Sequence, residues 1–141
     1  MSGARQHFAF LVNGYDTAFV EKTISETDVY LFAGITGDLN PAHVNEETMK
    51  TSRFRGRIAH GMLSAGFIST VLGIQLPGPG TIYLSQSLQF RGPVRIGDTL
   101  KAEVRVVEKL EKGRIRLQTM CTIKDGTVVV EGEAIVLPPR E

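Results

Sequence analysis

The stretch HGMLSAGFISTVLG, residues 60–73, decides the fold expected of this chain. At 3.6 residues per turn, its apolar residues fall on every side of a helix and leave no continuous polar face. These residues are Met62, Leu63, Ala65, Phe67, Ile68, Val71 and Leu72. Because a helix with this pattern is surrounded by protein, the sequence predicts a long core helix over residues 60–73.

From about residue 80 onward, the hydrophobic period becomes two, which is typical of half-buried strands. Apolar residues alternate with charged ones, from Leu100 to Val106, and a second alternating run places Ile115 to Ile123 on one side. The expected strands are TAFVEKTIS (17–25), TIYLSQSLQF (81–90), TLKAEVRV (99–106), RIRLQTMCTI (114–123) and VVVEGEAIVL (128–137).

Two short segments between these strands carry turn signals. KDGT (124–127) contains the Asp-Gly pair that favours a tight hairpin, and RIGDT (95–99) is a second turn. All the strands are compatible with antiparallel pairing. The sequence therefore predicts an α+β fold, in which a curved antiparallel sheet of about five strands wraps around the central apolar helix.

Length, charge and cysteine content limit the classes of protein to consider. The 141 residues fit one domain, 1–141, and the net charge of +1 provides no basic face for nucleic acid. A single cysteine, Cys121, excludes an intrachain disulfide and is read as a small core residue. The start MSGARQHFAF lacks the layout of a secretion signal, and its His7 suggests no role. No apolar run approaches the roughly 20 residues that span a bilayer, so we expect a cytoplasmic protein.

The segment GDLNPAH, residues 37–43, carries an acid and an imidazole between two helical segments. Ser25 and Asp28 form a capping-box pattern that predicts a helix over about 26–35, and NEETMKTS (45–52) suggests another short one. Gly37 permits a turn, and Pro41 pushes the residue before it toward extended geometry. Residues 37–43 are therefore expected to form a shaped loop.

An Asp and a His in one loop are weak evidence of catalysis, because Asp and Asn are common in turns. The context strengthens the signal, since His60 and Gly61 stand where the core helix begins. Free backbone donors and the positive end of a helix dipole can stabilise a developing oxyanion there. His60 could also complete a metal site with Asp38 and His43, but a packed or capping histidine is the favoured reading.

Four segments in order resemble the MaoC-type hydratases of the hotdog fold, and specifically the (R)-specific enoyl-CoA hydratases. They are FAGITGDLNPAHVNEE (32–47), GRIAHGML (56–63), LPGPGTIYLSQSLQF (76–90) and PVRIGDTL (93–100). The resemblance covers nearly the whole chain after residue 15. It implies reversible hydration of a trans-2-enoyl-CoA to an (R)-3-hydroxyacyl-CoA, with no metal or organic cofactor, coenzyme A being part of the substrate.

The same resemblance assigns roles to five residues. The catalytic pair would be Asp38 and His43, with the Gly61 backbone N–H as oxyanion donor and Asn40 and Ser69 in support. In this reading His43 takes a proton from water while Asp38 helps to deliver one to C2, an assignment inferred from the family. Two other hydroxyls share the helix with Ser69, those of Ser64 and Thr70, and any of these can bond back to its own backbone.

A cluster of arginines in SRFRGR has two readings. Arg53, Arg55 and Arg57 could bind the phosphates of coenzyme A, or they could form a solvated surface. In LPGPGT, Gly78 and Gly80 have no third glycine and precede a strand, so the dinucleotide fingerprint is absent.

Other functions remain open at the level of sequence. A hotdog acyl-CoA thioesterase, a 3-hydroxyacyl dehydratase acting on acyl carrier protein and a non-catalytic acyl-CoA-binding module are the alternatives. The complete set of Asp38, Asn40 and His43 favours hydration. The resemblance also implies a homodimer with sheets joined at their edges, which would cover an exposed strand, and an apolar acyl tunnel near the interface. Chain length, pathway and physiological direction stay open.

Overall fold

The computed structural model describes residue 14 and residues 16–139. The expectations for MSGARQHFAF and His7 lie outside this part of the chain. In chain order the elements are β1 (Thr17–Thr23), α2 (Glu26–Thr36), α3 (Pro41–Val44), α4 (Glu46–Met49), α5 (Gly61–Ile74), β2 (Ile82–Gln86), β3 (Gln89–Phe90), β4 (Thr99–Lys109), a 3-10 turn (Glu111–Gly113), β5 (Ile115–Ile123) and β6 (Val128–Leu137).

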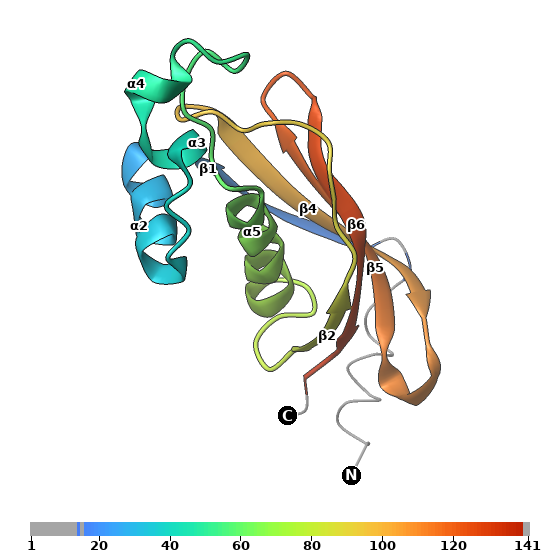
Figure 1. The fold of residues 1–141 in the computed structure, drawn as a ribbon. Coiled ribbons are helices and arrows are strands. Elements are labelled where there is room, and N and C mark those ends of the chain that lie inside the picture. Colours follow the sequence, from blue (N-terminus) through green and yellow to red (C-terminus); the bar gives the residue numbers. More distant parts are fainter. Residues whose placement is uncertain (1–13, 15, 140–141) are drawn as a thin grey trace.

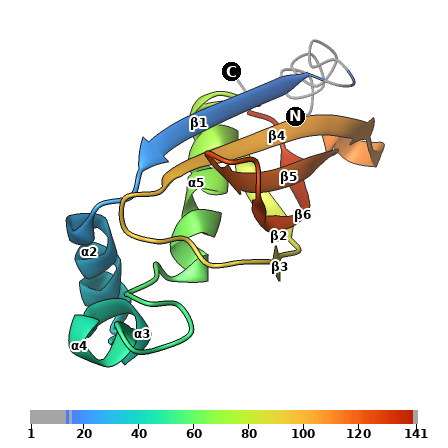
Figure 2. The ribbon, with the colours of Figure 1, turned by 90° about the horizontal axis from the view of Figure 1, so that it is seen from above.

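One antiparallel sheet curves around α5, and the three other helices gather beyond one end of it (Figures 1 and 2). The strand order is β1-β4-β5-β6-β2, and β3 pairs with β6. The predicted hotdog architecture is thus confirmed, with α5 against one face of the sheet. Both turn predictions are also confirmed, since Gly126 (φ 92°) lies between β5 and β6 and Gly97 (φ 99°) precedes β4.

The sheet has six strands in place of about five because TIYLSQSLQF is interrupted. The chain leaves β2 at Gln86 and resumes pairing with β6 only at Gln89. At the break, the Ser87 N–H donates to the Glu133 carbonyl and the Glu133 N–H donates to the Ser87 hydroxyl, each at 2.9 Å. A period of two does not reveal this bend.

Alternation along β4 and β5 builds the core. The inward residues of β4 and β5 are fully or almost fully buried: Leu100, Ala102, Val104, Val106, Ile115, Leu117, Thr119 and Cys121. All of these except Thr119 pack with Ile68, Val71 and Leu72 of α5 in one cluster. Burial also raises the pKa of the Cys121 thiol to about 12, so it behaves as a small core side chain and not as a nucleophile.

The helix predicted over 60–73 is observed as Gly61–Ile74, but it is not enclosed on all sides within one chain. Ser64, Ala65, Ile68, Val71 and Leu72 face the core, whereas Met62 and Ile74 are 54% and 66% exposed. The expectation of a fully surrounded helix is therefore wrong for the single chain. Part of α5 remains uncovered, and it includes Met62, Gly66, Ser69 and Ile74.

The segment before this helix forms from local signals. The Ser25 and Asp28 capping box is confirmed, and α2 ends at Gly37, whose φ of 80° is left-handed. The ion pair with Lys22 and the hydrogen bond from the Ser25 N–H lower the pKa of Asp28. The capping box thus fixes the start of the helix whose far end leads into GDLNPAH.

The expectation of an unbroken loop over residues 37–43 is wrong in its second half. Helix α3 begins at Pro41, where the missing N–H of proline costs nothing, and the Asn40 side chain caps it by accepting from Ala42 N–H at 3.0 Å. The short helix expected in NEETMKTS is confirmed as α4. In residues 14 and 16–139, no helix combines the length and apolar character needed to cross a membrane.

The close approach of Ser87 to Gly132 predicts that a larger residue at position 132 lowers the stability of the fold. A Cβ at Gly132 of β6 would overlap the Ser87 carbonyl, which is backbone and cannot swing away. We expect Gly132→Ala to lower the free energy of unfolding by about 2 kcal/mol or more, measured by urea denaturation.

The matched control is Gly34→Ala in α2, where a Cβ would meet nothing within 4 Å. Helix propensity predicts that this change is neutral or stabilising by about 0.5–1 kcal/mol. Equal unfolding midpoints for wild type and Gly132→Ala would contradict the described crossing of β6 and the β2–β3 bend.

Candidate active site

The loop between α2 and α3 is shaped by its own polar side chains. Asp38 Oδ1 accepts from Asn40 N–H at 3.3 Å, and the Asp38 N–H donates to the Thr36 hydroxyl at 3.2 Å. Asn40 then caps α3, so its side chain orders the loop. Asp38 is exposed, and His43 follows in the first turn of α3.

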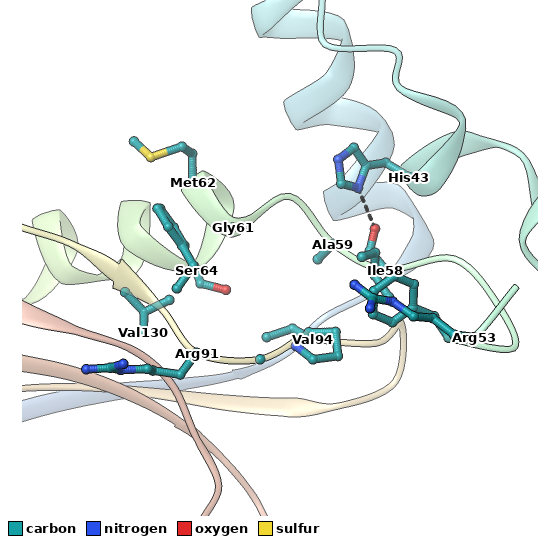
Figure 3. A pocket seen from close by; sticks show the side chains of 14 residues that line it. His43, Arg53, Ile58, Ala59, Gly61, Met62, Ser64, Arg91, Val94 and Val130 are labelled. Carbon is teal, nitrogen blue, oxygen red and sulfur yellow. Dashed lines mark hydrogen bonds between the residues drawn. The ribbon is translucent and has the colours of Figure 1, made fainter.

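The tautomer of His43 follows from its hydrogen bond. His43 Nδ1 lies 2.7 Å from the Ile58 carbonyl oxygen, and a dashed line marks this hydrogen bond in Figure 3. Because a carbonyl only accepts, Nδ1 carries the proton and Nε2 carries the lone pair. The Ile58 N–H returns a bond to the Ala42 carbonyl at 3.0 Å, which fixes this chain segment against α3. His43 therefore offers Nε2 as a proton acceptor.

His60 lies behind this pair and is only 3% exposed. Its Nε2 is 3.0 Å from the Asp38 backbone carbonyl, so Nε2 is the protonated nitrogen. Its ring stacks on that of His43, with centroids 3.7 Å apart and an angle of 26°, and Phe32 lies 4.8 Å away. His60 occupies the N-cap position of α5 but makes no capping bond, so it is a packed histidine.

The same three residues were tested as a metal site. Asp38, His43 and His60 each place one possible ligand atom within 4.8 Å of the others. A histidine binds a metal along the lone pair in its ring plane, at about 2.1 Å. Two nearly parallel rings at 3.7 Å direct their lone pairs side by side and not toward one ion. This arrangement does not fit a shared metal ion.

A cavity of about 550 Å³ opens beside His43 (Figure 3). Its lining is mainly apolar, with Ser64 on its wall and the start of α5 at one side. The lining residues include His43, Arg53, Phe54, Gly61, Met62, Phe90, Arg91 and Val130. An apolar cavity with a few polar groups is the usual form of a small-molecule site.

Gly61 supplies the backbone end of this cavity. Among the described residues, no hydrogen bond engages its N–H, as expected for the first turn of a helix. A Cβ at this position would lie 2.6 Å from Cδ1 of Phe90, so only glycine lets that ring pack against the start of α5. Gly61 and His43 thus line one cavity.

The three predicted arginines have different places. Arg53 lines the cavity, whereas Arg55 is exposed outside its lining. Arg57 is paired with Glu26 at 2.7 Å and Glu46 at 3.0 Å, and its side chain is 12% exposed. The sequence does not separate these roles, because the backbone turns between the three residues.

Arg57 also donates to the Tyr30 hydroxyl. Its guanidinium therefore joins α2, through Glu26 and Tyr30, to α4, through Glu46. This network holds the segment that leads to Ile58.

Sequence reasoning missed Arg91, which lines the cavity and pairs with Glu131 at 2.7 Å. It also missed Met62 and Phe90 as lining residues. Met62 and Phe90 lie within GRIAHGML and LPGPGTIYLSQSLQF, and Arg91 follows the second segment, so only this position in the chain could have suggested them.

Ser69 is not in this cavity. It lines a second one of about 430 Å³, between α5 and β2, with Tyr83 and Leu84, and Met62 borders both cavities. Burial raises the pKa of Tyr83 to about 12, and its hydroxyl donates to Gln86. Of the three helix hydroxyls, only that of Ser64 shares a cavity with Gly61.

The chain is similar to proteins of established name. The MaoC like domain model matches residues 13–129. An (R)-specific enoyl-CoA hydratase of Rhodospirillum rubrum is 59% identical over 124 residues, which are 87% of this chain and 85% of that protein. A 3-hydroxybutyryl-CoA dehydratase of Methylorubrum extorquens is 49% identical, covering 89% of this chain and 80% of its own length.

Among solved structures, the unliganded R-hydratase PhaJ1 from Pseudomonas aeruginosa superposes with a TM-score of 0.91 at 44% identity. The match covers 94% of this chain and 86% of that one.

The ion pairs of Arg57 predict that its loss lowers stability more than the loss of Arg55 does. Because Arg57→Ala would leave two carboxylates and a hydroxyl without their shared cation, we expect it to cost about 1–2 kcal/mol of unfolding free energy. Urea denaturation measures this cost. Arg55→Ala is the control and should change stability by less than about 0.5 kcal/mol. Equal effects of the two changes would contradict the bridging role.

Proposed function

The chain belongs to the MaoC-like dehydratase family, and we propose that it hydrates trans-2-enoyl-CoA reversibly to (R)-3-hydroxyacyl-CoA with Asp38, His43 and Gly61 as its catalytic groups. It is a hydro-lyase of the (R)-specific enoyl-CoA hydratase type. The observation that carries the site assignment is the His43–Ile58 hydrogen bond, which leaves His43 Nε2 unprotonated beside an apolar cavity.

In the proposed reaction, the elements of one water add to the double bond, the hydroxyl group at C3 and a hydrogen at C2. This water lies between His43 Nε2 and the Asp38 carboxyl group, its oxygen attacks C3, and a proton is delivered to C2. The negative charge that develops on the thioester oxygen is stabilised by the Gly61 N–H and the positive end of α5. His43 takes a proton from this water while Asp38 helps to deliver one to C2, and the two roles reverse for dehydration.

The proposed reaction uses no metal or organic cofactor, because His43, Asp38 and the Gly61 N–H supply the proton transfers and the charge stabilisation that the reaction needs. Coenzyme A enters only as part of the substrate, and the position of Arg53 in the cavity lining supports a contact between this arginine and the phosphates of coenzyme A. Asn40 contributes by capping α3 and ordering the loop. We place the active chain in the cytoplasm and treat 1–141 as one domain, both from the sequence.

The test of function uses crotonyl-CoA. We expect the enoyl-thioester absorbance to fall without release of free thiol, and the product to be the (R)-3-hydroxyacyl-CoA. His43→Asn keeps a donor for the Ile58 carbonyl but removes the base, and Asp38→Asn removes the carboxyl group. Each should lower kcat by about 100-fold or more while unfolding midpoints stay close to wild type.

Arg55→Ala, exposed and outside the cavity, is the control and should retain full activity. Near-wild-type turnover by either Asn variant would overturn the site assignment. Thiol release would instead indicate a thioesterase, and activity only with acyl carrier protein would indicate that carrier.

We also propose that the chain is a homodimer. The support is an apolar surface of α5 and the edge strand β2, where Ile82 and Leu84 are each 47% exposed. The cavity that contains Ser69 lies on this surface, between α5 and β2. A second copy would cover the edge of the sheet and close that cavity.

The proposed dimer predicts that a charge introduced on β2 separates the two copies. Wild type should elute with twice the 15.4 kDa mass of one chain in size-exclusion chromatography with light scattering. Because Leu84→Glu would place a charge in the interface, it should shift the protein to a folded monomer. Phe19→Glu, on the opposite edge strand and beside Lys101, is the control and should leave the dimer intact. A monomeric wild type would contradict the proposal.

A further inference from the structure

His60 connects the groups assigned to catalysis, although it does not line the cavity. Its Nε2–H donates to the Asp38 carbonyl at 3.0 Å, its ring stacks on His43 at 3.7 Å, and Gly61 follows it in the chain. The side chain is buried, so it contacts these groups and not the contents of the cavity.

The imidazole carries a cost that a simpler side chain would avoid. With the proton on Nε2, the buried Nδ1 has no hydrogen-bond partner among the described residues. A buried polar atom without a partner costs about 1–3 kcal/mol and calls for an explanation. A phenylalanine would stack on His43 without this cost, but it could not donate to the Asp38 carbonyl. The contribution of the imidazole is therefore a donor and a ring face together.

That contribution follows from the geometry of His43. The bond from His43 Nδ1 to Ile58 fixes one atom of the ring, but the ring could still swing about that bond. Stacking against His60 removes this freedom, and Phe32 packs against the His60 ring in turn. The direction of the His43 Nε2 lone pair is fixed only when both contacts are made.

The contact to Asp38 has a similar effect on the loop. The Asp38 N–H is held by Thr36 and its carbonyl by His60, so both backbone groups of this exposed residue are bonded. Because the residue before Gly61 provides this bond, the loop and the start of α5 cannot shift independently.

We propose that His60 is a positioning residue, which sets the ring plane of His43 and ties the Asp38 loop to the oxyanion donor Gly61. This inference rests on the proposed hydratase function. A misplacement of about 1 Å at such groups can cost about 100-fold in rate. Because His60 does not line the cavity, its loss leaves the surface that would bind substrate in place. Loss of His60 should therefore lower kcat and leave KM nearly unchanged.

Two variants of the full chain separate the hydrogen bond of the His60 ring from its stacking contact. His60→Gln keeps a donor for the Asp38 carbonyl and loses the stacking, whereas His60→Phe keeps the stacking and loses the donor. With crotonyl-CoA, each should lower kcat by about 10-fold, with KM within about threefold of wild type. His60→Ala should lose about 100-fold, so that each larger side chain restores part of the rate.

Val29→Ala, a fully buried change in α2 outside the site, is the control for lost stability alone. It should lower the unfolding midpoint and leave kcat near wild type. If His60→Ala does not fold, the Gln and Phe variants decide. Wild-type kcat in both, a loss confined to KM, or a loss in Val29→Ala as large as theirs would overturn the proposal.

NMR spectra of the protein with ¹⁵N-labelled histidine test the positioning of His43 independently of catalysis, because they report the exchange of its ring proton with solvent. Wild type should show a protected proton on His43 Nδ1, which exchanges faster with solvent in all three His60 variants. A wild type that hydrates crotonyl-CoA, with unchanged exchange and kcat in the variants, would refute the role of His60 alone. An inactive wild type would refute the proposed function, while the exchange rates would still test the positioning.

Discussion

The hydrogen bond from His43 Nδ1 to the Ile58 carbonyl is the interaction on which the candidate site depends. Ile58 is itself held to the sheet side of the molecule, because it forms a bridge with Arg95 and the next residue, Ala59, donates to the Val94 carbonyl at 2.7 Å. The position of the His43 imidazole is therefore fixed relative to the segment that leads into β4, one of the most buried strands. In this way a side chain beside a loop is held as rigidly as the core.

The fold places the cavities where the curved sheet and its helix do not fill one another. The concave sheet buries one side of α5, and Met62 on the uncovered part of the helix borders both cavities. A fully enclosed helix would leave no such space along its length. The uncovered part of α5, which includes Met62 and Ile74, is the surface on which both the proposed acyl site and the proposed contact with a second copy depend.

Local rules predicted the elements whose causes are local. The capping box, the alternation in β4 and β5 and the Asp-Gly turn depend on neighbouring residues, and the structure confirms each. What failed depends on distant partners. The break between β2 and β3 follows from contacts of Ser87 with β6, and the open face of α5 depends on whether this chain or another covers it. Arg53 and Arg57 differ only because two carboxylates, distant in sequence, lie beside Arg57.

The motif GDLNPAH specifies chemistry through its backbone as much as through its acid and base. Both histidines of the site receive their tautomers from carbonyl groups, those of Ile58 and Asp38, which accept hydrogen bonds whatever side chain they carry. The Asp38 carbonyl reaches His60 because Gly37 turns the chain with a φ of 80° that most residues avoid. Pro41 then starts the helix that presents His43. Gly37 therefore sets the protonated nitrogen of His60, because it directs the Asp38 carbonyl, whereas Pro41 starts the helix that brings His43 to the Ile58 carbonyl outside the motif.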